Sequence, residues 1–434
     1  MPVTSLQRRQ YPLRVELDTA EIPDTFTRFL DLVGDSHWRK RVAQIKSAIK
    51  GNPLLREHLI GENEIAFGFN ACSDLTQRYG RIPINEMDCR HVYPCMALAA
   101  QILSIIDIST SLQARQLVRR VHGALKNPDD MRALQLELAV ATHFTRRGHS
   151  LAWPETDGTG TMDMVINDLG PSGLEVECKS VSSDKGRKIH RTEALEFWHL
   201  LSPKLKTICD RLKIGLSVVL TVEGRLSPTF KNRQQLAQMV LSNLLNGQSI
   251  TMLPSATLRV SEFDPSLLGV SRTEGTPVLA RATIDQITQT ENREVMIIGR
   301  KSGGAIAFVL QSSDDDTPLP YVFDTLARSA SRQLSKNRAG LFLVGFHGIE
   351  AESLLSIAEQ DSDANQPPTA LTRHVSDFLS GQSRDHVIGV GFLSKSGLHP
   401  HDAAVLDSGG STYIFPKKES PFWHEDFTGL FSPP

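Results

Sequence analysis

Three charged residues stand at a spacing suited to metal-assisted hydrolysis of a phosphodiester bond. Glu177 and Lys179 lie two residues apart in one short apolar run, and Asp163 lies in the short apolar run before it. Because side chains alternate along a strand, Glu177 and Lys179 would share one face, and Asp163 could meet Glu177 across a strand pair. Two carboxylates within reach of one divalent cation, with an amine beside them, provide the groups for this chemistry.

Two short strands must carry these residues. Residues 162–166 and 174–179 are rich in residues that favour strands. The connection between them contains the turn-forming residues Asn167, Asp168, Gly170, Pro171 and Gly173. The sequence therefore predicts a strand pair. Glu175 would share the face of Glu177 but comes two residues earlier, so we expect it at most to support the site.

Glu137 is a further candidate, on a helix predicted over residues 131–147 with Asp129 or Asp130 as its N-cap. Its neighbours three and four positions away are all apolar: Ala133, Leu134, Val140 and Ala141. A carboxylate in an apolar stripe is costly to bury unless something pairs with it, and a nearby metal ion would provide that partner. The alternative is a partly buried helix from which Glu137 reaches solvent.

Residues 160–163 (Gly-Thr-Met-Asp) and 174–180 (Leu-Glu-Val-Glu-Cys-Lys-Ser) resemble the core of the PD-(D/E)XK (restriction-endonuclease-like) nuclease superfamily. Glu137 matches the acidic residue that many members place on the preceding helix. The resemblance covers residues 131–182, and beyond them it is only architectural. Met162 stands where the name of the superfamily has proline, at a position that varies widely.

The resemblance implies an α/β fold with a restriction-endonuclease-like core, which is a mixed central sheet flanked by helices. It implies catalysis by Asp163, Glu177, Lys179 and Glu137. It also implies one or two Mg²⁺ or Mn²⁺ ions, held by Asp163 and Glu177 with Glu137 and the backbone carbonyl of Cys178. Lys179 would position or deprotonate the attacking water, or stabilise the transition state.

The order of predicted elements suggests two domains. We expect a mainly helical N-terminal domain over residues 1–125 and a nuclease-like domain with added elements over residues 126–425, because helices and strands alternate there. Helices are predicted at residues 192–213, 232–246 and 321–336. Strands are predicted at residues 216–222, 256–260, 295–298, 305–310, 341–346, 386–393 and 411–415.

The composition is that of an ordinary globular protein, with 434 residues, 40% hydrophobic and 22% charged residues, and a formal charge of −2. A charge near zero does not exclude nucleic acid as a partner, because local patches decide phosphate binding. The start of the chain lacks a signal peptide, and no apolar run is long enough to span a bilayer. We therefore expect a soluble, cytoplasmic protein without a membrane partner.

The five cysteines are scattered and odd in number, so they predict no disulfide framework, as expected for a reducing cytoplasm. Cys89, His91 and Cys95 could suggest a zinc site, but no second Cys/His pair with ligand spacing completes it. Buried thiols are the favoured interpretation.

Two groups of residues could contact nucleic-acid phosphates. Lys185, Arg187, Lys188 and Arg191 follow the strand of Lys179. The second group lies on the predicted helix 321–336 and comprises Arg328, Arg332, Gln333 and Lys336. The alternative for both groups is a solvated surface. No zinc-finger, helix-turn-helix, RNA-recognition or P-loop motif is present, so sequence-specific readout and nucleotide hydrolysis are not predicted.

The sequence therefore favours a metal-dependent endonuclease acting on DNA. The resemblance points to nucleases of bacterial restriction, anti-phage defence or mobile elements. One alternative is an RNA-directed or structure-specific nuclease with the same site, and another is a non-catalytic nucleic-acid-binding subunit that kept the fold. A homodimer would suit cleavage of both strands, and an ATPase partner subunit would gate an enzyme that is silent alone.

Overall fold

The computed structural model describes residues 13, 17–83, 89–154, 158, 160–246, 249–268, 281–290, 294–299, 304–347, 349, 351–394, 397–402, 405–409 and 411–430. The chain forms two compact units. The first unit comprises Met1–Lys46, Ile60–Lys185 and Leu319–Pro434, and the second comprises Ser47–Leu59 and Gly186–Pro318. Most of the second unit is thus an insertion into the first. The predicted domain boundary near residue 125 stays a prediction.

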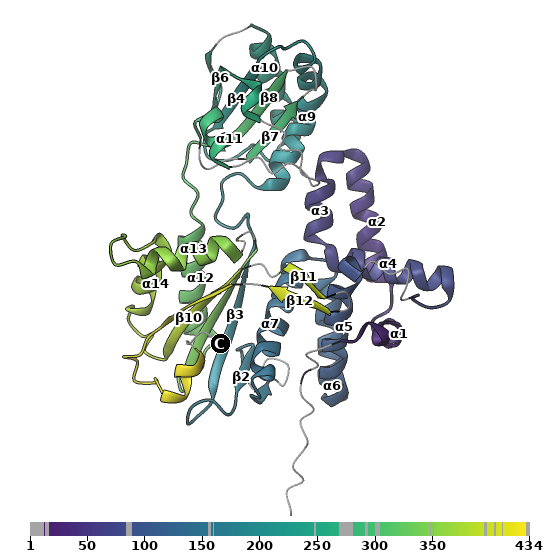
Figure 1. The fold of residues 1–434 in the computed structure, drawn as a ribbon, viewed down its shortest axis with the longest axis vertical. Helices are drawn as coiled ribbons and strands as arrows, with labels where there is room; N and C mark the ends of the chain where they lie inside the picture. Colours follow the sequence, from purple (N-terminus) through teal and green to yellow (C-terminus); the bar gives the residue numbers. More distant parts are fainter. Residues whose placement is uncertain are drawn as a thin grey trace, which may run out of the picture. The chain divides into compact units, whose positions relative to one another are not determined.

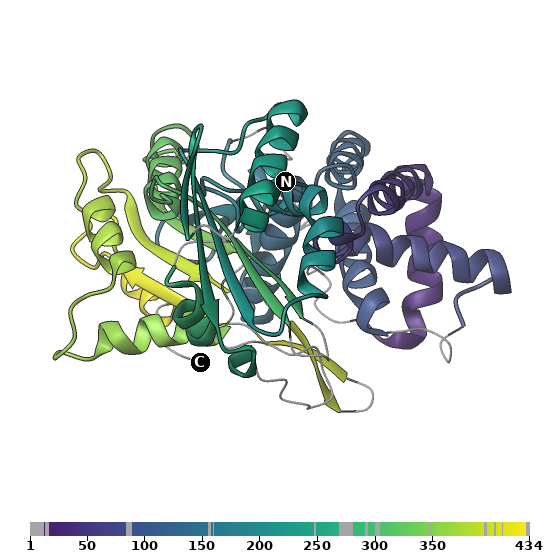
Figure 2. The same cartoon turned by 90° about the horizontal axis from the view of Figure 1, so that it is seen from above.

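The first part of the chain is helical. It contains η1 (Thr19–Glu21), α1 (Ile22–Val33), α2 (Ser36–Gly51), η2 (Pro53–Leu55), α3 (Arg56–Glu62), α4 (Glu64–Tyr79), α5 (Cys89–Ile108), α6 (Ser111–Ala124) and α7 (Pro128–Arg146). Helices of this region in the first unit lie beside one another (Figure 2). They pack around a core rich in aromatic residues that includes Phe26, Phe29, Trp38 and Phe69.

Helix α7 starts earlier than the sequence suggests. Asn127 is its N-cap and accepts a hydrogen bond from the Asp129 N–H, and Pro128 is the first helical residue. The prediction of Asp129 or Asp130 as the N-cap was therefore wrong. Proline fits the first helical position because its missing N–H would have no partner there.

The first unit contains a six-stranded mixed sheet. Its order is β1 (Leu151–Ala152), β2 (Met164–Ile166), β3 (Leu174–Val181), β9 (Ala339–Phe346), β10 (Val387–Leu393) and β13 (Thr412–Pro416). Strands β3, β9 and β10 are parallel, whereas β1, β2 and β13 pair antiparallel with their neighbours. All residues of the central strand β9 are buried, as expected for an apolar run in a sheet covered on both faces.

Helices cover both faces of this sheet. Helix α7 lies on one side, and α12 (Pro318–Arg332) and α14 (Ala370–Leu379) lie on the other (Figure 1). Leu174, Val176 and Cys178 of β3 belong to the core that includes α7. The intervening residues Glu175, Glu177 and Lys179 therefore point to the side of α12 and α14. We call this side the α12 face. Helix α13 (Ala351–Ser362) follows β9 in the chain.

The second unit has its own five-stranded mixed sheet. Its order is β5 (Ile250–Leu253), β6 (Ala256–Phe263), β4 (Gly215–Val222), β8 (Ala305–Ser312) and β7 (Glu294–Gly299). Strands β4 and β8 are parallel, and the other pairs are antiparallel. Helices α9 (Arg191–Cys209) and α10 (Phe230–Asn246) pack on it through a shared apolar core, and α11 (Arg281–Thr288) contacts β4 and β8.

The remaining described elements are η4 (Pro265–Leu268), the antiparallel pair of β11 (Gly397–Asp402) and β12 (Val405–Gly409), and η5 (Glu425–Leu430). The fold is mixed α/β with two mixed sheets flanked by helices, which confirms the predicted α/β class. In the described ranges we find no helix with both the length and the apolarity needed to cross a membrane.

The cysteines that the structure describes with their side chains are free thiols. Cys72, Cys95, Cys178 and Cys209 are all buried. The side chains of Cys89 and His91 lie outside the described part of the chain, so the zinc alternative is not tested at those two positions.

Candidate active site

Asp163 and Glu177 lie opposite each other at the end of the β2–β3 ladder. Met164 pairs with Val176 and Val165 with Glu175, and this register places Asp163 across from Glu177. The Asp163 Oδ2 atom accepts the backbone N–H of Cys178 at 2.7 Å. Strand β2 begins at Met164, so the carboxylate satisfies an N–H group of β3 that has no backbone partner in β2. This bond fixes Asp163 beside Glu177.

Glu177 is a buried carboxylate under electrostatic stress. Its Oε1 atom accepts a hydrogen bond from the Lys179 Nζ atom at 2.6 Å, whereas the buried Oε2 atom accepts none from the described residues. Burial and the neighbouring Asp163 carboxylate raise the pKa of Glu177 to about 8, although the Lys179 amine acts in the opposite direction. A cation near Glu177 would offset the cost of burial and the repulsion by Asp163, and would stabilise the ionised carboxylate.

Lys179 connects Glu177 to a residue far away in the sequence, Gln333. Its side chain is 21% exposed, and its Nζ atom also donates to Gln333 Oε1 at 2.8 Å. A lysine ammonium carries three N–H donors. Two of them are directed to Glu177 and Gln333, which leaves one for a ligand. Gln333 was predicted as a nucleic-acid contact, and the structure places its amide oxygen on Lys179.

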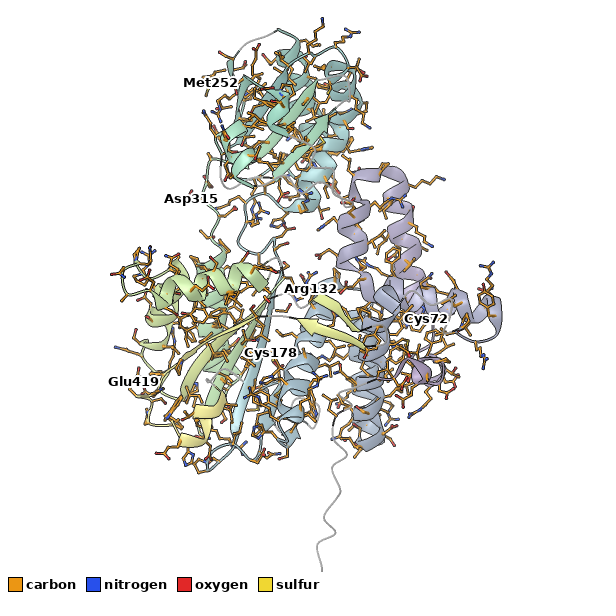
Figure 3. All side chains as sticks on the ribbon, in the orientation of Figure 1. Cys72, Arg132, Cys178, Met252, Asp315 and Glu419 are labelled. Atoms are coloured by element: carbon orange, nitrogen blue, oxygen red, sulfur yellow. The ribbon has the colours of Figure 1, made fainter. Side chains whose placement is uncertain are left out.

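Cys178 (labelled in Figure 3) contributes backbone atoms to the site, and its side chain is turned to the opposite face. The N–H and C=O of one strand residue point to the same side of the strand. Because its N–H bonds to Asp163, the Cys178 carbonyl also points toward Asp163. Burial, together with the charges of Asp163, Glu137 and Glu177, raises the pKa of the Cys178 thiol well above its usual value.

Glu137 lies on the other side of the sheet from Glu177. It is buried on α7, which packs against the face of β3 that carries Cys178. Its carboxylate accepts a hydrogen bond from Arg120 of α6, so Arg120 provides a charge partner for Glu137. Among the described residues, no three His, Cys, Asp or Glu side chains are grouped to hold a metal ion. Glu137 as a metal ligand stays a prediction.

The oxygen atoms around Glu177 suit a hard divalent cation. The donors are the carboxylates of Asp163 and Glu177 and the Cys178 carbonyl, and the buried Glu177 Oε2 atom has no hydrogen bond from the described residues. Mg²⁺ is commonly held by one or two carboxylates while it keeps several water ligands. The residues present therefore fit Mg²⁺ or Mn²⁺.

A second contact, between strand β3 and the segment after α12, was not predicted from the sequence. Glu175 is fully buried, and its Oε2 atom accepts the backbone N–H of Ser335 at 2.8 Å. The hydroxyl of Thr161 donates to the Gln333 carbonyl at 2.8 Å. The segment that follows α12 thus lies over the α12 face of β3, next to Glu175 and Lys179. Only the fold brings these residues together, because Ser335 is 160 positions from Glu175.

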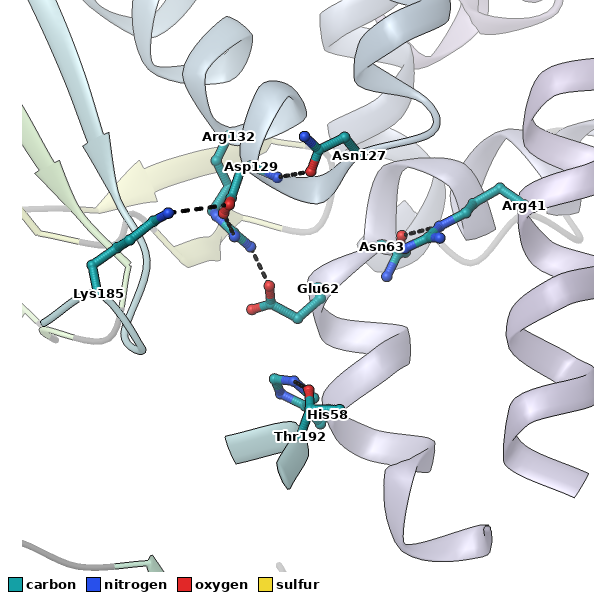
Figure 4. Close-up of polar contacts among 9 residues, drawn as sticks. All are labelled: Arg41, His58, Glu62, Asn63, Asn127, Asp129, Arg132, Lys185 and Thr192. Atoms are coloured by element: carbon teal, nitrogen blue, oxygen red, sulfur yellow. Dashed lines mark hydrogen bonds and ion pairs between the residues drawn. The ribbon is translucent and has the colours of Figure 1, made fainter. Parts of the chain in front are cut away.

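The basic residues of the first predicted group form ion pairs with carboxylates. Lys185 lies 3.7 Å from Asp129 in the first unit (Figure 4). In the second unit, Lys188 lies 3.6 Å from Asp314. Arg187 and Arg191 both pair with the buried Glu294. Each of the four residues thus has a carboxylate partner within its own unit, and their contact with nucleic acid stays a prediction.

In the second predicted group, the two arginines are exposed and have no carboxylate partner among the described residues. Arg328 and Arg332 are exposed on α12. Within the described part of the chain, Arg328 donates to the Asp324 carbonyl and the Thr325 hydroxyl, both on its own helix. Neither arginine forms an ion pair with a carboxylate in the described part of the chain. Arg332 immediately precedes Gln333, whose side chain reaches Lys179.

Comparison of the chain with protein-family models, with curated proteins and with solved structures found no match. The proposal for its function therefore rests on the resemblance of the motif and on the chemistry of the site. Those two sources concern the same residues, Asp163, Glu177 and Lys179.

Proposed function

We propose that this protein is a metal-dependent endonuclease that hydrolyses DNA, and that its first unit is a restriction-endonuclease-like core. The observation that carries the proposal is the pair of Asp163 and Glu177, with the Lys179 amine bonded to Glu177. A structural ion pair would need one acid and one base. Here a second acid, Asp163, lies beside the pair of Glu177 and Lys179, and the buried Glu177 Oε2 atom accepts no hydrogen bond from the described residues.

The architecture supports the proposal. The motif lies on two adjacent strands of a mixed sheet, with helices on both faces. This is the arrangement that the resemblance implies for residues 131–182 and for the elements beyond them. The mainly helical N-terminal region is proposed as a domain for substrate or partner contacts.

Asp163, Glu177 and the Cys178 carbonyl would hold Mg²⁺ or Mn²⁺, and Glu137 is a predicted additional ligand. When bound, such a cation lowers the pKa of a water molecule and neutralises charge on the scissile phosphate. We expect Ca²⁺ to bind without supporting turnover, because it is larger and less strict in its coordination geometry.

Lys179 acts on the reacting groups directly. Glu177 and Gln333 hold two of its N–H donors, and the third is directed to a phosphate oxygen or to the attacking water. A donor that is already oriented costs no reorganisation when charge builds up in the transition state. Removing such a group typically lowers the rate by roughly 10²–10³-fold.

The test is cleavage of supercoiled plasmid, linear duplex, single-stranded DNA and RNA with Mg²⁺, Mn²⁺ or EDTA. We expect metal-dependent cleavage of DNA by the wild type and its loss in Lys179→Ala. The matched control is Lys126→Ala, which removes an exposed lysine after α6 and should cleave normally.

Three results would contradict the proposal. Cleavage that persists in Lys179→Ala would show that another site or a contaminant cuts DNA. Cleavage of RNA alone would show that the substrate is wrong. A wild type that cuts no substrate is not a stand-alone nuclease, and a partner-gated enzyme or a binding subunit would then replace the proposal.

A further inference from the structure

Hydrogen bonds to Thr161 and to Glu175 hold the end of α12 and the segment after it over the α12 face of β3. The Thr161 hydroxyl donates to the carbonyls of Arg332 and Gln333, at 3.4 and 2.8 Å. Glu175 Oε2 accepts the backbone N–H of Ser335 at 2.8 Å. We call residues 332–335, which are the last residue of α12 and the three that follow it, the α12 latch. Its ends are held by groups from the loop before β2 and from β3, so its position is tied to the strands of the site.

Burial of the Glu175 carboxylate costs more free energy than a purely structural role would require. Its side chain is fully buried, and its Oε1 atom accepts no hydrogen bond from the described residues. A buried carboxylate with unsatisfied hydrogen-bonding capacity is unfavourable compared with an apolar residue of similar size. The contact that Glu175 does make is with the latch.

The latch carries the residue that orients the Lys179 amine. The Gln333 carbonyl accepts from Thr161, and the Gln333 Oε1 atom accepts from Lys179 Nζ at 2.8 Å. Glu177 Oε1 accepts from the same amine at 2.6 Å. Two acceptors from different elements restrict a flexible lysine side chain and so fix the direction of the third N–H donor.

We propose that Glu175 and Gln333 are positioning residues for Lys179. Glu175 holds the α12 latch, and Gln333 on the latch holds the amine. The effect on catalysis rests on the proposed nuclease function, whereas the effect on the amine itself does not. The competing role, direct contact of Gln333 with nucleic acid, predicts a different outcome in the experiments below.

The first experiment measures the amine without any substrate. The protein is treated with limiting acetic anhydride, and acetylation of Lys179 is compared by mass spectrometry with that of the exposed Lys126. We expect Gln333→Ala to raise the relative reactivity of Lys179 about fivefold, the size expected for loss of one hydrogen bond. The control is Gln101→Ala, which removes another half-buried glutamine bonded to a side chain, Thr142.

The second experiment tests the anchor. In Glu175→Gln, the amide oxygen can still accept the Ser335 N–H, so Lys179 should react as in the wild type. In Glu175→Ala that acceptor is lost, and the reactivity should rise as in Gln333→Ala. If Glu175→Ala does not fold, Glu175→Asp replaces it, because its shorter side chain withdraws the carboxylate from Ser335.

The third experiment separates positioning from substrate contact. For cleavage of a short DNA duplex, we expect Gln333→Ala to lower kcat roughly 10–100-fold, since a misplaced catalytic group has an effect of that size. KM should not change. A raised KM with an unchanged kcat would show that Gln333 contacts DNA and would overturn the proposal.

The two proposals fail in distinguishable ways. If the wild type cleaves nothing, the nuclease proposal fails, and the reactivity of Lys179 still decides the positioning proposal. If Lys179 reacts equally in the wild type, Gln333→Ala and Glu175→Ala, the positioning proposal is wrong even for an active nuclease.

Discussion

The carboxylate of Asp163 binds the backbone N–H of Cys178, the residue that follows Glu177 in β3. One short contact therefore fastens the end of β2 to β3 and also brings two acidic side chains together. Without a cation, this arrangement is unfavourable for Glu177, whose pKa is raised to about 8 by burial and by Asp163. The same contact thus forms the site and holds two carboxylates close together. A bound cation would compensate their mutual repulsion.

Cation binding should depend on pH. Because the proton on Glu177 competes with the cation, affinity should rise as the pH approaches about 8 and level off above it. Titration of Mn²⁺ by calorimetry from pH 6 to pH 9 would measure this dependence. An affinity that is independent of pH, or equal in Asp163→Asn, would place the cation elsewhere.

Removing the charge of Glu177 should stabilise the protein in the absence of divalent cations. The folded-state pKa is about 8 against an ordinary value of 4.5, so the folded state holds more protons in that interval. The stability that Glu177 contributes is therefore lost as the pH rises from 4.5 to about 8. Glu177→Gln should have a higher Tm than the wild type above this window and an equal one below it.

The matched control for that comparison is Glu352→Gln, which changes an exposed glutamate of α13 and should leave the pH dependence of Tm unaltered. Thermal unfolding in EDTA at several pH values provides the measurement. A Glu177→Gln variant that is less stable than the wild type at pH 9 would mean that Lys179 outweighs burial and Asp163.

Asp163 has a structural and a chemical role that substitution can separate. Asp163→Asn retains an oxygen for the Cys178 N–H, so it should remain folded while losing cation affinity. Asp163→Ala leaves that N–H without its acceptor and should lower the free energy of unfolding by about 1–3 kcal/mol. Urea unfolding and Mn²⁺ titration of both variants test this, and equal stability of the two would contradict it.

Arg120 should stabilise the fold through Glu137. The Glu137 side chain is 5% exposed and that of Arg120 is 36% exposed, so solvent weakens the pair. Arg120→Met should cost about 1–2 kcal/mol, less than the loss of a fully buried partner. In a Glu137→Gln background the cost should be smaller. A double-mutant cycle measured by urea unfolding gives the coupling, and additive costs would show that the two residues act independently.

The exposed arginines of α12 should contact DNA phosphates, since they have no carboxylate partner among the described residues. Arg328→Ala and Arg332→Ala should each weaken DNA binding and reduce the slope of log affinity against log salt by about one. Fluorescence anisotropy with Ca²⁺ measures this without cleavage. The control pair is Arg115 and Arg119, equally spaced and exposed on α6. An equal loss in the control pair would mean that binding is diffuse.

The site could be predicted where its determinants are local. Asp163 and Glu177 are joined by a short turn, so alternation along the strands was enough to place them opposite each other. The buried strand β9 was visible as an apolar run. Helix α12 was expected at residues 321–336, and it spans Pro318–Arg332.

Contacts between distant residues could not be predicted in this way. Gln333 is 154 positions from Lys179, and nothing in its own neighbourhood indicates that partner. Similarly, Glu294 is 107 positions from Arg187, so the sequence does not indicate that Arg187 and Arg191 pair with a carboxylate of a later strand. The charge partner of Glu137 was missed because Arg120 belongs to the preceding helix.

The insertion of residues 186–318 between β3 and β9 also sets the order of assembly during synthesis. During translation β3, which carries Glu177 and Lys179, is synthesised long before its parallel neighbour β9. Gln333, which accepts from the Lys179 amine, is also synthesised later than β3. The inserted segment has its own sheet and core, so it can fold during that interval. Until β9 arrives, the nascent chain carries the acidic pair without the oriented lysine. If the protein is the nuclease that we propose, it should stay inactive until most of its length has left the ribosome.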